Sequence, residues 1–184
     1  MEYELIRSAR RTLSVEVKPD GRIVVRAPLT LSKRRIDRFL LEREEWIEDA
    51  QRKYEKRNEA LLKIDKLSEK EIRDLKNEAR RELTALCEEY ADIMGLDYNR
   101  VSIRTQRTRW GSCSRDRNLN FNALLMLAPE GARRYVVVHE LCHLWEMNHS
   151  KRFWDKVSKY CPDWRYERRW LKKNGDALIA RLPD

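Results

Sequence analysis

The sequence predicts an α+β fold, with helices packed on a small sheet and one helix buried. Three observations lead to this prediction. Apolar residues alternate with polar ones in short runs, which indicates strands, and recur every 3.6 residues in longer runs, which indicates helices. The segment Tyr135 to Trp145 is apolar on nearly every face, which indicates a buried helix. A chain of 184 residues can bury one core and a small appendage, so we expect one main domain with an extra module.

The N-terminal residues predict a β-hairpin followed by a helix. Two alternating runs, at residues 13–17 and 23–27, are separated by the turn signal Pro19-Asp20-Gly21. A hydroxyl side chain, that of Ser32 or Thr30, can cap the helix that follows. The apolar residues of this helix keep to a 3.6-residue period up to Ala50.

A polar stretch is the best candidate for a boundary between modules. The helical pattern dissolves over Gln51 to Ala60. We therefore expect an N-terminal β-hairpin and helix module at residues 1–60 and the main domain at residues 61–184. No internal repeat or low-complexity segment is visible in the sequence.

The main domain is expected to begin with a long packing helix. Ser68 and Glu71 have the spacing of a capping box at its start, and Gly95 lies where it should end. Two or more strands should follow, because apolar residues alternate at 101–105 and again at 119–123. Between these runs, Gly111 and Ser112 are expected to break the pattern.

The next helix should begin near Pro129, a residue that suits a first helical turn. Its valines at 136–138 are poor helix formers, so a strand is the local alternative. The spacing of the histidines favours the helix. Asp163 is a candidate cap for a last helix.

Composition and charge limit the classes of function. Charged residues make up 39% of the chain and the net charge is +9, which favours anionic partners such as nucleic acid, nucleotides or acidic peptides. Basic residues are concentrated at 100–117 and at 165–173, each with a single opposing acidic residue. Either stretch fits an anion site or an ordinary solvated surface, because the charge of a sequence does not show which residues converge in space.

No stretch approaches the roughly 20 apolar residues of a membrane span, and Met1 to Arg11 lacks the apolar run of a signal peptide. We therefore expect a cytoplasmic protein without membrane contact. The cysteines are scattered without a CxxC pair, which favours reduced thiols over disulfides or a cysteine-held zinc. They are Cys87, Cys113, Cys142 and Cys161.

The three histidines of the chain lie within an eleven-residue window. His139 and His143 are four residues apart, so on a helix both can bind one zinc ion, at about 2.0–2.1 Å. Glu140 can take a proton from the zinc-bound water, which is the chemical meaning of an HExxH motif. His149 is the expected third ligand, because a catalytic zinc keeps its fourth position open. We therefore predict one Zn²⁺ per chain and hydrolytic chemistry. The alternative is a buried helix with incidental histidines.

The spacing of the histidines matches the ligand frame of metzincin proteases, except that Glu146 stands in place of their glycine. Asn148 tolerates left-handed geometry and is the expected substitute for the turn that the glycine makes. Phe153 and Trp154 are expected to pack the following helix into the core, and Cys142 to be a small core residue.

Together with these residues, several longer motifs resemble the YgjP-like metallopeptidase family, which is related to the SprT-like and WLM zincins. The resemblance covers nearly the whole chain. It rests on RWGSC at 109–113, NALLMLAP at 122–129, YVVVHELCHL at 135–144, and NHS at 148–150 followed by Phe153-Trp154. It implies a zincin-like metallohydrolase domain of α+β class, with the hairpin and helix module in front.

The resemblance implies a peptidase, in which an extended substrate pairs with a strand edge before the motif helix. Thr105 to Trp110 is the expected edge. Arg107 and Arg109 would then share one face of a strand, so we expect both, with Trp110, to bind substrate. The second implied activity is hydrolysis of a phosphoanhydride in a nucleoside triphosphate such as UTP, which arginines would suit.

A nucleic-acid-binding module with a structural metal is the third candidate. It is disfavoured because Glu140 and an open ligand position are needed only for catalysis. A basic surface could still contact nucleic acid beside a peptidase site.

Overall fold

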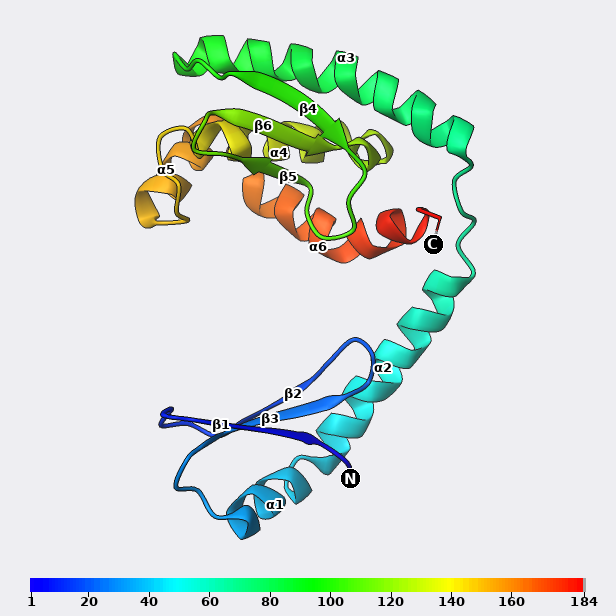
Figure 1. The fold of residues 1–184 in the computed structure, drawn as a ribbon, viewed down its shortest axis with the longest axis vertical. Coiled ribbons are helices and arrows are strands. Elements are labelled where there is room, and N and C mark those ends of the chain that lie inside the picture. The colour runs from blue at the N-terminus through cyan, green and yellow to red at the C-terminus, as the bar shows by residue number, and fades with distance from the viewer. Residues whose placement is uncertain (184) are drawn as a thin grey trace. The chain divides into compact units, whose positions relative to one another are not determined.

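The computed structural model describes residues 1–183 and confirms the α+β class. Contacts within the chain divide it into two compact units, the N-terminal unit Met1–Lys63 and the C-terminal unit Ile64–Asp184 (Figure 1). Each unit has its own three-stranded sheet and its own helices. Within the described residues, no helix is both long and apolar enough to cross a membrane.

The N-terminal unit is a sheet of order β1-β3-β2 with two helices. The predicted hairpin is confirmed, because β2 and β3 pair antiparallel. Strand β1 was not predicted and pairs parallel with β3. The elements are β1 (Glu4–Ser8), β2 (Ser14–Val17), β3 (Ile23–Pro28), α1 (Lys33–Leu41) and α2 (Glu44–Leu62).

The single helix expected after the hairpin is two helices. Ser32 caps α1, as one of the two predicted hydroxyls, by accepting a hydrogen bond from the backbone nitrogen of Arg35. Helix α2 then continues through Gln51–Ala60, where the apolar pattern dissolves, because its polar residues contact the hairpin. The core between the sheet and the helices includes Val25, Ala27, Ile36 and Ile47, all fully buried.

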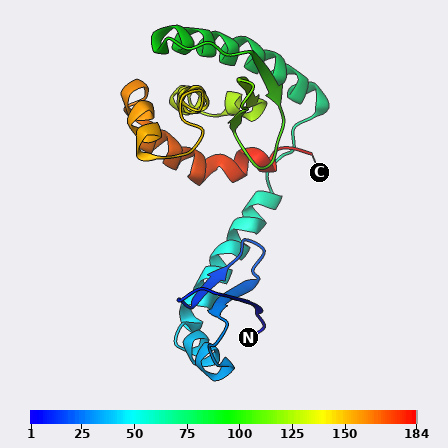
Figure 2. The same cartoon turned by 60° about the vertical axis from the view of Figure 1, so that its left-hand side comes forward.

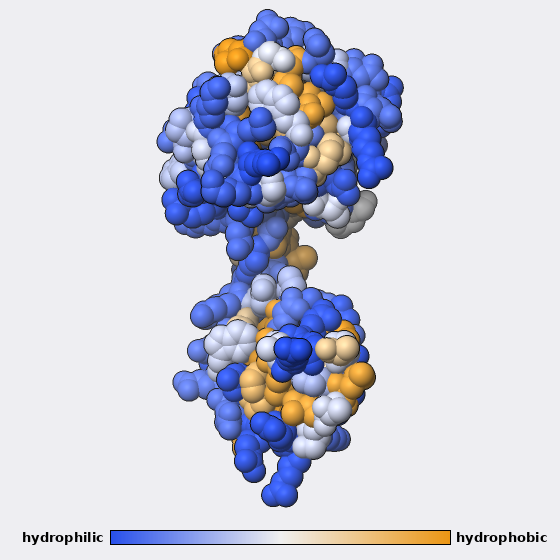
Figure 3. All heavy atoms as spheres, turned by 90° about the vertical axis from the view of Figure 1, so that its left-hand side faces the viewer, coloured by the Kyte–Doolittle hydropathy of each residue, from blue (hydrophilic) through white to orange (hydrophobic). Residues whose placement is uncertain are grey.

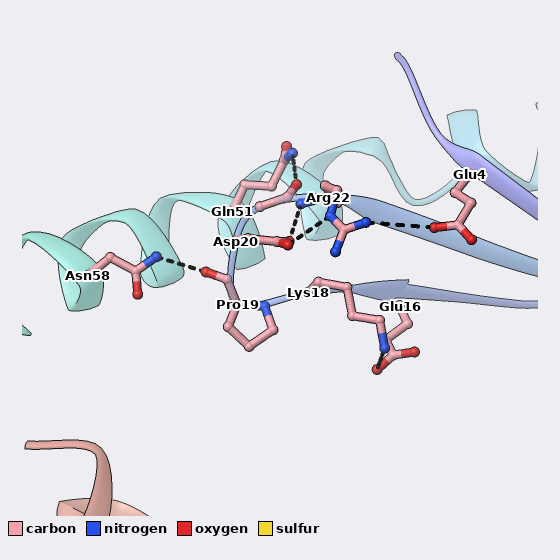
Figure 4. A network of polar contacts seen from close by, with 9 residues as sticks. Glu4, Glu16, Lys18, Pro19, Asp20, Arg22, Gln51 and Asn58 are labelled. Atoms are coloured by element: carbon pink, nitrogen blue, oxygen red, sulfur yellow. Dashed lines mark hydrogen bonds and ion pairs between the residues drawn. The ribbon is translucent and has the colours of Figure 1, made fainter. Parts of the chain in front are cut away.

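Polar contacts fix the hairpin turn on α2 (Figure 4). Gln51 Nε2 donates to the carbonyl of Gly21 and Asn58 Nδ2 donates to the carbonyl of Pro19, both at 2.8 Å. Asp20 accepts two hydrogen bonds from Arg22, one from its backbone nitrogen and one from Nε. The polar residues of α2 therefore stabilise the N-terminal unit by binding the hairpin turn.

In the C-terminal unit, α4 is surrounded by the other helices and the sheet (Figure 2). The sheet has the order β4-β6-β5, with β4 parallel and β5 antiparallel to β6, so β5 is an edge strand. Helix α4 contacts α3, α5, α6 and β5. The elements are α3 (Glu69–Met94), β4 (Arg100–Arg104), β5 (Gly111–Cys113), β6 (Asn118–Asn122), η1 (Ala123–Leu127), α4 (Glu130–Cys142), α5 (Lys151–Tyr160) and α6 (Trp164–Ala180).

The predicted helices of this unit are present. Ser68 and Glu71 form the capping box of α3, and Gly95 ends it with a φ of 65°. Pro129 directly precedes α4, and Asp163 precedes α6 without a side-chain cap bond. The valines at 136–138 are buried, with at most 4% exposure, so packing compensates for their low helix propensity.

The strand predictions need one correction. Thr105–Trp110 is a loop, and the strand begins at Gly111, where a break was expected. The reason is that Asn122 binds backbone carbonyls of this loop, which a strand would use in its ladder.

The surface seen in Figure 3 is mostly hydrophilic, with apolar patches on both units. The most exposed large apolar side chain is that of Leu62, at 85%. In the C-terminal unit, Ile93, Met147 and Tyr166 are exposed.

Candidate metal centre

The three histidines come together at the end of α4. His139 lies in its last turn, His143 is its C-cap, and His149 comes from the loop before α5. One ligand atom from each can be chosen so that all lie within 4.8 Å of one another, and Nε2 of His139 is 3.0 Å from Nε2 of His149. Two nitrogens that share a tetrahedral zinc lie about 3.3 Å apart, so this spacing suits a metal ion.

Hydrogen bonds orient the two rings of α4. His143 Nδ1 lies 3.0 Å from the carbonyl oxygen of Glu146. A carbonyl can only accept, so Nδ1 carries the proton and Nε2 is left with its lone pair. His139 Nδ1 lies 3.5 Å from the hydroxyl of Tyr135, one helical turn earlier. Glu146 therefore orients His143 through its backbone carbonyl.

The turn before the third histidine differs from the prediction. Arg117 is the only non-glycine residue with positive φ among the described residues, so Asn148 is not left-handed and the prediction is wrong. Asn148 instead accepts a hydrogen bond at Oδ1 from the backbone nitrogen of Ser150, at 3.2 Å. The side chain thereby makes the turn that a left-handed backbone would have made.

Phe153 and Trp154 pack α5 into the core, as expected, and their rings also lie beside the histidines. The ring of Phe153 is fully buried and lies 4.5 to 4.8 Å from the centroids of all three imidazoles. Trp154 stacks on Trp164 at 4.3 Å. The contact of Phe153 with His149 holds α5 against the loop before it, and the stack of Trp154 on Trp164 joins α5 to the start of α6. Cys142 is fully buried and serves as a core residue.

Burial shifts the pKa values of the site. It lowers the pKa of His139 to about 3, with the neighbouring imidazoles adding to the effect, and it lowers the pKa of His143 as well. Neutral imidazole is the form that binds metals. Burial raises the pKa of Glu140 to about 8, and the positive charge of Arg109 acts in the opposite direction.

The absence of a side chain at Gly111 leaves space for the carboxylate of Glu140. A Cβ atom at residue 111 would lie 2.6 Å from Oε1 of Glu140 and 2.7 Å from its Cγ, closer than such atoms can approach. The first residue of β5 must therefore be glycine if the carboxylate is to lie against the strand.

A cavity of about 390 Å³ opens beside His139, the one histidine in its lining. Helix α4, the start of β5 and helix α6 form its walls. Its lining consists of Trp110, Gly111, Tyr135, Val136, His139, Glu140, Arg168, Leu171 and Lys172.

The three residues expected to bind substrate have different surroundings. Trp110 lines the cavity. Arg109 is exposed but close enough to act on the charge of Glu140. Arg107 donates a hydrogen bond to the carbonyl of Pro183 and does not line the cavity. The expectation of a common strand face for the two arginines is wrong, because this segment is a loop.

Sequence reasoning missed the role of Asn122. Its fully buried side chain donates to the carbonyls of Gln106 and Arg109, at 2.8 and 3.2 Å, and accepts from the backbone nitrogen of Leu124 at 3.1 Å. Its own backbone nitrogen donates to the carbonyl of Trp110. Asn122 thus holds the loop that carries Trp110 to the cavity. The strand reads NLNFN, so its sequence alone does not distinguish Asn122 from Asn118 and Asn120.

Comparison with known proteins places the chain among the metallopeptidases. It belongs to the YgjP-like metallopeptidase domain family, whose sequence model matches residues 11–73 and 60–174. No curated protein matches it.

Two solved structures are similar to parts of the chain. One is the metallopeptidase zymogen abylysin of Pyrococcus abyssi, at 26% identity and a TM-score of 0.44, over 50% of this chain and 93% of that one. The other is the metallopeptidase zymogen jannalysin of Methanocaldococcus jannaschii, at 19% identity and a TM-score of 0.43, over 50% and 95%.

Proposed function

We propose that the protein is a zinc metallopeptidase in which His139, His143 and His149 hold one zinc ion and Glu140 is the general base. One observation carries this proposal. Three imidazoles converge within 4.8 Å, next to a cavity whose lining includes the buried Glu140. All four residues lie in the C-terminal unit, so we also propose residues 61–184 as the catalytic domain.

The residues of the site fit zinc, because neutral imidazole nitrogens are ligands it prefers and three of them leave a position open. When bound, zinc supplies a Lewis acid that polarises a carbonyl and lowers the pKa of a water molecule. In its ionised form, which the charge of a bound zinc ion would favour, Glu140 accepts the proton of the attacking water at a carboxylate oxygen and donates it to the nitrogen of the departing amine. Phe153 keeps the imidazoles apart from bulk water on the buried side.

The edge strand β5 is our candidate for binding the peptide, in place of the loop Thr105–Trp110. One side of β5 pairs with β6, and no other described strand pairs with it. Gly111, at the start of β5, lines the cavity with Glu140. An extended peptide could add to this edge with its scissile bond near the histidines.

Hydrolysis of a nucleoside triphosphate is the second candidate, because Arg168 and Lys172 in the cavity wall would suit phosphate. The family of the chain favours the peptidase. A module that only binds nucleic acid would not need a buried glutamate beside the histidines.

The deciding experiment compares Glu140→Gln with Glu130→Gln, an exposed glutamate at the start of the same helix. Zinc-loaded protein is incubated with casein and with nucleoside triphosphates, and bound zinc is measured. We expect Glu140→Gln to keep its zinc and to lose about 10²-fold to 10⁴-fold in kcat on casein, while the control keeps both. Unchanged casein cleavage by Glu140→Gln would refute its role. Hydrolysis of UTP alone, lost in the same variant, would replace the peptidase by the second candidate.

The metal ligands are tested separately. His149→Ala should lower zinc occupancy strongly, whereas Met147→Ala, an exposed neighbour, should not. Full occupancy in His149→Ala would remove this residue from the ligand set.

A further inference from the structure

Helix α6 brings two positive charges to the wall of the cavity. Arg168 and Lys172 are four residues apart, on one face of the helix, and both line the cavity that also holds His139 and Glu140. Leu171, which is 6% exposed, fixes this part of the helix in the core. The hydrophobic pattern of the sequence does not predict that α6 packs on α4, so only the fold shows that these charges lie beside His139 and Glu140.

The positive surface continues beyond the cavity. A second hollow, also of about 390 Å³, shares Arg168 and Lys172 with the first and is lined in addition by Trp164, Arg165 and Arg169. Among the residues that line either hollow, the only acidic one is Glu140. A chain that enters the cavity and continues along α6 therefore meets positive charge at successive positions.

Arg168 is held close to the histidine cluster. Its guanidinium carbon lies 5.1 Å from the ring centroid of Trp154, within the range of a cation–π contact. The same ring lies 5.8 Å from the centroid of His139. Elsewhere in this unit, Arg133 has an acidic partner in Glu82, at 2.5 Å. Across residues 1–183, no ion pair of this kind is found for Arg168 or Lys172.

These observations extend the proposed peptidase function and rest on it. We propose that Arg168 and Lys172 form an anion subsite that selects peptides with an aspartate or glutamate close to the scissile bond. A guanidinium binds a carboxylate with two parallel hydrogen bonds, and the ammonium group adds a further donor. A cavity of about 390 Å³ is roughly 9 Å across and accommodates about three extended residues. The acidic side chain is therefore within about three residues of the bond that is cut.

The test uses full-length, zinc-loaded protein and pairs of peptides that differ only by Asp/Asn or Glu/Gln exchange at each position within three residues of the cleaved bond. At low salt, we expect the acidic peptide of the best pair to have a kcat/KM about tenfold higher. In Arg168→Ala/Lys172→Ala the two peptides of each pair should be cleaved at equal rates, because the carboxylate has lost its partners. The advantage should shrink in high salt, because ions screen exposed charges.

A matched control removes the same charge elsewhere in the unit. Lys70→Ala/Arg80→Ala changes two exposed residues of α3 that do not line either hollow, and it should keep the preference. Binding gives a second readout without turnover. The acidic peptide should bind to Glu140→Gln about tenfold more tightly than the neutral one, and this difference should vanish when Arg168 and Lys172 are also replaced.

The outcomes separate this inference from the function it extends. Cleavage of both members of every pair at equal rates by the wild type would overturn the subsite and leave the peptidase intact. A preference that survives in Arg168→Ala/Lys172→Ala, or that disappears equally in the α3 control, would also overturn it. Absence of peptide cleavage by the zinc-loaded wild type would refute both proposals together.

Discussion

Replacing Asn122 by alanine should destabilise the C-terminal unit and loosen the cavity. The substitution removes three side-chain hydrogen bonds at a fully buried position. The backbone nitrogen of Leu124, a fully buried residue, is left without its partner, which costs about 1–3 kcal/mol. The carbonyls of Gln106 and Arg109 lie in a loop that water can reach, so each lost bond costs about 1 kcal/mol.

The sum is about 4 kcal/mol in the free energy of unfolding, or about 15 °C in Tm for a unit of this size. Tryptophan fluorescence is a selective probe, because five of the six tryptophans lie in the C-terminal unit and only Trp46 lies in the other. Urea unfolding followed by this signal gives the free energy, and kcat/KM on casein reports the placement of Trp110.

Asn118→Ala is the matched control, since Asn118 lies on the same strand but is only half-buried and binds side chains at the surface. It should lose less than about 1.5 kcal/mol. If Asn122→Ala unfolds at the same urea concentration as this control, the hydrogen bonds of Asn122 do not hold the loop and the reasoning is refuted.

Two further predictions concern Gly111 and Glu167. Gly111→Ala should lower kcat by about 10²-fold with little loss of bound zinc, because the new Cβ displaces Glu140 and not a histidine; zinc analysis beside kinetics checks this, and a wild-type kcat would contradict it. Glu167 is 8% exposed, its Oε2 has no hydrogen-bond partner among residues 1–183, and burial raises the pKa of its carboxyl. A raised folded-state pKa means that stability falls as pH rises from the unfolded pKa through the folded one, so Glu167→Gln should raise Tm at pH 7 and leave it nearly unchanged below pH of about 4. An equal change in Tm at both pH values would argue against the charge of Glu167 as the cause.

The elements that sequence predicted well are those set by local chemistry. The capping box of Ser68 and Glu71 and the left-handed Gly95 fix both ends of α3 within a few residues of the chain. The turn at Pro19-Asp20-Gly21 likewise determines its own hairpin. Within the site, the four-residue spacing of His139 and His143 puts both rings on one helix face.

The features that sequence missed depend on partners far away in the chain. Strand β1 joins the sheet by pairing with β3, which is separated from it in the sequence by β2 and the hairpin turn. The loop before β5 is decided by Asn122, thirteen residues after Arg109. Arg168 comes to the cavity only because α6 packs on α4. A period in the hydrophobic pattern reports which face is buried, and not which other element buries it.

The contact between His143 and the carbonyl of Glu146 also bears on which sequences can build this site. An imidazole in water moves its proton between two nitrogens, and here a main-chain oxygen selects one of the two forms. Every amino acid has that oxygen. Position 146 can therefore change its side chain without changing the tautomer of His143, provided that the backbone keeps its course. Related chains with quite different residues at this position would preserve the same donor geometry, and a search that insists on one residue there would overlook them.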